Sequence, residues 1–80
     1  MARYYFHLRD HTDEILDPEG LELPDRDAVR AAALRSARDI LSHEMRTGEI
    51  DLRYRIDVED ADGSAVHSLP LADAFKIVGP

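Results

Sequence analysis

The chain has 80 residues, a formal net charge of −7, no Cys, and 44% apolar and 34% charged residues. This length allows one domain, and the composition is that of a globular protein rather than a disordered one. The lack of Cys excludes disulfides, thiolate metal sites and Cys nucleophiles. The negative charge opposes long-range attraction to nucleic acid or to an anionic membrane.

The N-terminal residues do not have the pattern of a signal peptide, and we expect no membrane span. Residues 1–10 lack the apolar stretch of a signal peptide, and no run approaches the roughly 20 apolar residues that a span needs. We therefore expect a cytoplasmic protein without a membrane partner. Because a domain this small buries little apolar surface and here has no disulfides, we expect self-association, as a homodimer, to add burial.

Apolar and polar side chains alternate over residues 3–9, as in a strand with one buried face. The inward set is Tyr4, Phe6 and Leu8, and the outward set is Tyr5, His7 and Arg9. A polar turn and a second apolar segment follow, which predict a strand over residues 14–23 that returns as a hairpin. Pro18 interrupts that strand, because proline has no amide hydrogen for the ladder.

The central segment predicts one long helix over residues 25–46. Asp25 can cap the free N–H groups of the first turn, and Gly48 is a suitable residue just past the end. At helical spacing, one apolar face collects Val29, Ala33, Leu34, Ala37, Ile40, Leu41 and Met45. The opposite face, which includes Arg35, Arg38, Asp39 and Arg46, has the pattern of a solvated helix surface.

Alternation returns over residues 52–59 and is followed by a turn and a strand over residues 64–69. We expect Leu52, Tyr54, Ile56 and Val58 to face the helix. Residues 71–75 predict a short helical turn, and residues 76–80 a frayed tail. The order β-β-α-β-β predicts an α+β fold: a four-stranded antiparallel sheet with one long helix packed on one face, in a single domain over residues 1–80.

The first hairpin gathers residue types that bind metals, namely His7, His11, Asp10, Asp13 and Asp17. Imidazole and carboxylate groups can hold a divalent cation, but no ligand spacing here matches a known pattern, and a solvent-exposed turn accounts for the same residues. Residues 57–63 superficially resemble a calcium loop. Counting from Gly63 puts Val58 and Leu69 at ligand positions that neither can fill. We expect no metal.

No nucleophile elbow, phosphate-binding glycine loop, zincin helix or serine triad is present. We therefore predict no catalytic residue, no cofactor and no enzymatic activity. The candidate surface is the sheet face away from the helix, with Tyr5, His7, Arg9, Arg53, Arg55 and His67. This face can be solvated, with Arg paired to Asp57 or Glu59, or can pack against a second copy. Aromatic and cationic side chains can also bind nucleic acid, which the net charge makes the least favoured reading.

Four segments together resemble a known family. They are Tyr4–Asp10, Glu19–Asp25, the Ala/Arg-rich helix, and Asp60–Gly63 followed by Leu69-Pro70-Leu71. They are similar to a group of short bacterial proteins classified only as a domain of unknown function, with the patterns Y-F-F-x-x-R-D, E-G-x-E-L-P-D and D-x-x-G. Tyr5 stands where Phe is commoner. The resemblance covers nearly the whole chain, and it implies a fold but no activity.

Two functional hypotheses follow. The first is a non-enzymatic interaction module, a homodimer that can also bind another protein. The alternative is a nucleic-acid-binding or antitoxin-like regulator that uses the open sheet face. The strand pair before a Leu-Pro-Asp helix entry looks like the small antitoxin domains of the HicB type. Those usually carry one more strand before the helix and a separate DNA-binding segment, for which this chain has no room.

Overall fold

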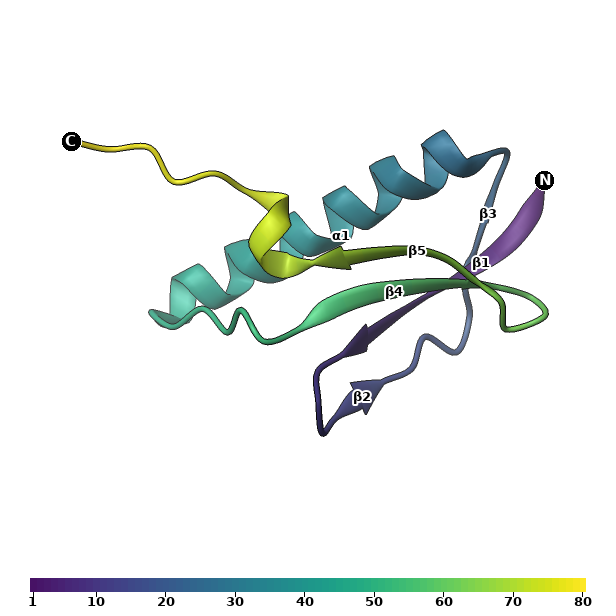
Figure 1. Ribbon diagram of the computed structural model, residues 1–80, viewed down its shortest axis with the longest axis horizontal. Coiled ribbons are helices and arrows are strands. Elements are labelled where there is room, and N and C mark those ends of the chain that lie inside the picture. The colour runs from purple at the N-terminus through teal and green to yellow at the C-terminus, as the bar shows by residue number, and fades with distance from the viewer.

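A computed structural model describes residues 1–80 and shows an antiparallel sheet with one long helix on one of its faces (Figure 1). The elements are β1 (Ala2–Arg9), β2 (Glu14–Ile15), β3 (Leu21–Leu23), α1 (Arg26–Thr47), β4 (Arg55–Asp60), β5 (Ala65–Pro70) and the 3-10 helix η1 (Leu71–Ala74). The predicted α+β class is confirmed. The sheet has five strands rather than four, because the interrupted second strand forms two separate pieces.

The strand order is β2-β1-β4-β5, and β3 also pairs with β1. β3 pairs with residues 2–4 of β1, and β2 pairs with residues 8–9, so the two short strands share one edge of β1. Between them the edge of β1 has no strand beside it. There the amide of Phe6 donates to Oδ2 of Asp17 over 3.1 Å. A side chain thus replaces the missing backbone partner.

Gly20 closes the segment between β2 and β3. Its amide donates to Oδ1 of Asp17, and its φ is 71°, in the left-handed region. A Cβ at this position would lie 2.8 Å from the carbonyl oxygen of Tyr4 and 2.9 Å from Cε2 of Tyr5. Glycine is required here twice over, for its backbone angle and for the close approach of β1.

The helix begins and ends as its capping residues predict. The Asp25 carboxylate accepts from the amide of Ala28 over 2.8 Å, and Gly48 ends α1 at φ 89°. Met45, expected on the core face, is 64% exposed. Figure 1 shows the reason: the last turns of α1 extend beyond the end of the strands, where there is no sheet to cover them.

β4 begins at Arg55, three residues later than the alternation predicts. Asp51 holds the preceding segment in a local turn, because its carboxylate accepts from the amide, Nε and Nη2 of Arg53. Such short-range hydrogen bonds compete with the strand ladder. Leu52, expected to face the helix, is consequently 45% exposed.

The core between α1 and the sheet is thin. Its buried apolar residues are Val29, Ala32, Ala33, Ala37, Leu41, Ile56, Val58, Leu71 and Ala74. Four of these nine are alanine, so the helix approaches the sheet closely but contributes little volume. Arg38, expected to be solvated, instead donates from Nε to the carbonyl of Ala74 over 3.0 Å and ties α1 to η1. No helix here has both the length and the apolar character needed to cross a membrane.

We predict that Gly20→Ala lowers the free energy of unfolding by at least about 2 kcal/mol. Alanine would be held at a positive φ that is unfavourable for it, and its Cβ would also overlap β1. Gly63→Ala is the matched control, since Gly63 has a φ of 82° but nothing within 4 Å of its Cβ position. It should lose only about 1 kcal/mol. Urea unfolding followed by circular dichroism measures both losses, and equal losses would contradict the overlap.

Candidate functional site

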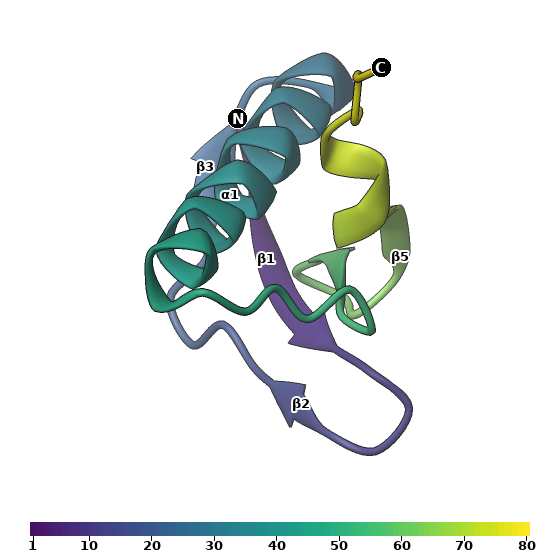
Figure 2. The ribbon, with the colours of Figure 1, turned by 90° about the vertical axis from the view of Figure 1, so that its left-hand side faces the viewer.

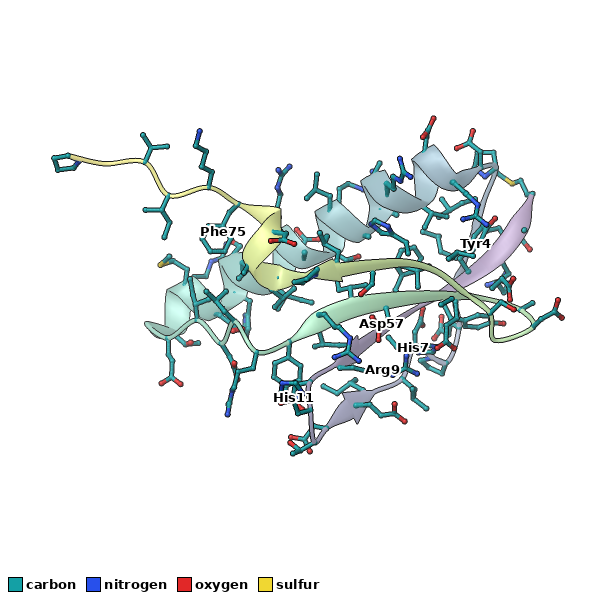
Figure 3. The ribbon with its side chains drawn as sticks, in the orientation of Figure 1. Tyr4, His7, Arg9, His11, Asp57 and Phe75 are labelled. Atoms are coloured by element: carbon teal, nitrogen blue, oxygen red, sulfur yellow. The ribbon has the colours of Figure 1, made fainter.

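The sheet face away from α1 carries a connected set of charged side chains. Cross-strand pairing sets Tyr5 opposite Glu59, His7 opposite Asp57 and Arg9 opposite Arg55. Paired residues of an antiparallel ladder share a face. Four of the six residues proposed for this surface (Tyr5, His7, Arg9 and Arg55) are therefore brought together, and Figure 3 shows His7, Arg9 and Asp57 close to one another.

Arg9 is the centre of this set. Its Nε donates to Glu14 over 2.8 Å, and its Nη1 lies 3.0 Å from Oε2 of Glu59 and 3.3 Å from Oδ2 of Asp57. The hydrogen bonds with Glu14 and then Glu59 raise the pKa of the guanidinium further above its ordinary value. Arg9 is thus a permanent cation that is paired with carboxylates from β2 and β4.

Asp57 connects three strands. Its carboxylate accepts from Oγ of Ser68 on β5 over 2.8 Å, from Nε of Arg55 over 3.0 Å, and from Arg9 on β1. Burial alone would raise the pKa of the Asp57 carboxyl. The hydrogen bonds from Ser68 and Arg9 and the nearby Arg55 charge outweigh it, so the pKa is lowered. Asp57 stays ionised and holds the two arginines in place.

His7 is 8% exposed and uses both ring nitrogens. Nδ1 accepts from the amide of Asp17 over 3.1 Å, which leaves the proton of the neutral ring on Nε2. Nε2 lies 3.3 Å from Oε1 of Glu59. The ring stacks against Tyr5, with centroids 6.4 Å apart and planes 8° from parallel. His7 is therefore built into the fold, with no ring nitrogen left for a ligand.

Arg53 and His67, also expected on this face, lie elsewhere. Arg53 belongs to the loop before β4 and pairs with Asp51, whose pKa its hydrogen bonds lower to about 2. His67 pairs with Val58, whose side chain is in the core, and so lies on the helix side. A bulge beside Val58 makes Val66 an extra residue and shifts the alternation of β5.

The His/Asp-rich end of the first hairpin is a turn. Oδ1 of Asp10 accepts from the amides of Asp13 and Thr12, and the Asp13 amide in particular lowers the pKa of the carboxyl. His11 is exposed at the tip of this hairpin, away from His7 (Figure 3). No group of three or more His, Asp or Glu side chains is placed to hold a metal ion.

An apolar groove at the C-terminal end of α1 was missed by sequence reasoning. This helix-end groove has a volume of about 590 Å³. Its apolar lining is Leu41, Met45, Ile50, Leu52, Phe75 and Ile77. Figure 3 places Phe75 here, where the chain leaves η1. The signal lay in three apolar residues at and just beyond the end of the last expected element, namely Phe75, Ile77 and Val78.

We predict that the stability contribution of Asp17 depends on pH. Burial would raise the pKa of its carboxyl, but hydrogen bonds from the amides of Phe6, Gly20 and Glu19 lower it overall. A lowered pKa means that the ionised form stabilises the fold. This contribution is complete above the ordinary pKa of about 4 and is lost as pH falls through the lower, folded value.

Asp17→Asn should therefore reduce the free energy of unfolding by about 1 to 3 kcal/mol at about pH 7, and the difference from wild type should shrink towards about pH 3. Denaturant unfolding at several pH values measures this difference. Asp13→Asn is the control, because the Asp13 carboxylate is exposed and accepts no hydrogen bond in the structure. A difference for Asp17→Asn that stays constant with pH would contradict the prediction.

Comparison with known proteins supplies a family and no activity. No curated protein and no solved structure matches the chain. A family model described as a domain of unknown function, DUF6894, matches residues 3–72, which include the whole of α1 and all of the strands except Ala2 at the start of β1. The match confirms the resemblance drawn from the sequence motifs. The chain is a member of this domain family of unknown function.

Proposed function

We propose that the protein is a non-enzymatic, cytoplasmic interaction module that acts as a homodimer. The observation that carries this proposal is the apolar surface at the C-terminal end of α1. Its exposed apolar residues are Met45, Leu52, Phe75 and Ile77, which line the helix-end groove, and Val78 follows them in the chain. Ile77 and Val78 are 84% and 81% exposed. Clustered exposed apolar side chains are typical of interaction sites, and in this chain they continue a groove that is itself apolar.

The thin core supports the same proposal. Only ten of 80 residues are buried, and four of the nine apolar ones are alanine. Apolar burial is the main favourable contribution to folding, and it scales with the area removed from water. A second copy is the occupant that we assign to the exposed surface, because one isologous contact adds burial to both chains at once.

The alternative, a nucleic-acid-binding or antitoxin-like regulator, gains less support from the geometry. Arg9 and Arg55 on the open sheet face are paired with carboxylates of Glu14, Asp57 and Glu59. A phosphate would have to displace these carboxylates and approach a protein of formal net charge −7. Phosphate contacts need available cations, and this face offers none that is unpaired.

We predict that sedimentation equilibrium detects a dimer at micromolar concentration, and that Ile77→Ser combined with Val78→Ser shifts it towards monomer. Both side chains are more than four-fifths exposed, so the fold should not change. The expected weakening is about tenfold or more, since each side chain contributes on the order of 1 kcal/mol or more when buried.

The matched control is Ala61→Ser combined with Ala65→Ser, two exposed positions in and beside the β4–β5 turn. This control should leave the dimer unchanged. A wild-type protein that remains monomeric over the whole micromolar range would overturn the proposed function. Circular dichroism of each variant establishes that its fold is intact.

A further inference from the structure

We propose that the segment Lys76–Pro80 of one copy docks on a second copy. It binds there in a groove on the β3 side of α1, which is the side away from η1. This inference rests on the proposed homodimer and names the surface of the second copy that receives the exposed Ile77 and Val78 side chains. The groove lies between α1 and the edge of β1 where no strand pairs, and we call it the edge groove. Its volume is about 450 Å³.

The edge groove has apolar walls and an acidic rim. Phe6 and Leu8 of β1, Leu21 of β3 and Ile40 of α1 form its walls. Asp17 and Asp39 also line it, and neither forms an ion pair with any cation of the chain. The groove therefore fits an apolar segment that carries one positive charge.

The segment after Phe75 has that chemistry. Lys76 is the only lysine in the sequence and is followed directly by Ile77 and Val78. Lys76 forms no ion pair, and the two apolar side chains are almost fully exposed. Residues 75–80 belong to no helix or strand. An unpaired cation, unburied apolar groups and free backbone are thus found together in one short segment.

Charge complementarity pairs the segment with the groove. An ammonium placed near the Asp39 and Asp17 carboxylates gains a charge-assisted hydrogen bond. Ile77 and Val78 can then cover the apolar walls. Five extended residues span at most about 17 Å, enough to lie along a groove of this size.

The geometry requires that the segment comes from another copy. Figure 2 shows η1 and the C-terminal residues on one side of α1, and β3 on the other. The helix therefore separates the segment from the edge groove of its own chain. Exchange between two copies makes the same contact twice, once in each direction, as a two-fold dimer requires.

A zero-length carbodiimide crosslink tests the contact directly, because it joins a lysine to a carboxylate that touches it. Lys76 is the only lysine, so every lysine crosslink starts from this residue. An equal mixture of ¹⁴N- and ¹⁵N-labelled protein distinguishes crosslinks between copies from those within one copy. We expect mixed-isotope peptides that join Lys76 to Asp39 or Asp17. Crosslinks only within one copy, or only to carboxylates outside the edge groove, would overturn the docking.

A charge exchange is the second test. Lys76→Glu alone and Asp39→Lys alone should each weaken the dimer by about tenfold, and the double variant should restore it. Asp62→Lys is the control, since it changes the net charge as Asp39→Lys does but lies in the β4–β5 turn. A wild-type dimer that all of these variants leave unchanged would refute the edge groove while the homodimer stands. A wild-type monomer would refute both.

Discussion

The carboxylate of Asp17 is the contact on which the rest of the sheet depends. β1 has no strand beside its centre on one edge, and Asp17 takes the place of one by accepting from the amide of Phe6. The same side chain accepts from Gly20 and Glu19, and the Asp17 amide donates to His7. One residue thus fixes the course of the chain between β2 and β3, the tautomer of His7, and the place where the edge of the sheet stays open. Three of these hydrogen bonds, from Phe6, Glu19 and Gly20, go to one carboxylate, so a change in that group affects all three at once.

The sequence was sufficient for elements whose local signals agree with their surroundings. β1 and α1 have a clear periodicity and recognisable ends, and both lie within a residue or two of the expected bounds. Errors arose where a local interaction competes with periodicity. The Asp51–Arg53 contact delays β4, the bulge at Val66 turns His67 to the helix side, and the length of α1 carries Met45 past the sheet. Alternation of side chains carries no information about any of these three effects.

The sequence predicted which residues share the candidate surface, but not which of its arginines are paired with carboxylates. Alternation placed Tyr5, His7, Arg9 and Arg55 on one face, and the structure has them there. Whether an arginine is available to a ligand depends on which carboxylates reach it across strands. Glu14 reaches Arg9 from β2 and Ser68 reaches Asp57 from β5, at separations that only the register determines. This is why a surface with the residue types of a nucleic-acid site is instead a network in which the arginines and carboxylates pair with one another.

The two edges of the sheet have a further consequence, for aggregation. An unprotected strand edge can add strands from other molecules without limit, and proteins avoid this with short strands, bulges and proline. One edge here is divided into β2, of two residues, and β3, of three. The other edge, β5, contains a bulge and ends at Pro70. Neither edge is a good template for continuous strand addition. Contact between copies is thereby directed to side-chain surfaces, which can close into a finite assembly, rather than to backbone pairing, which can extend into fibres.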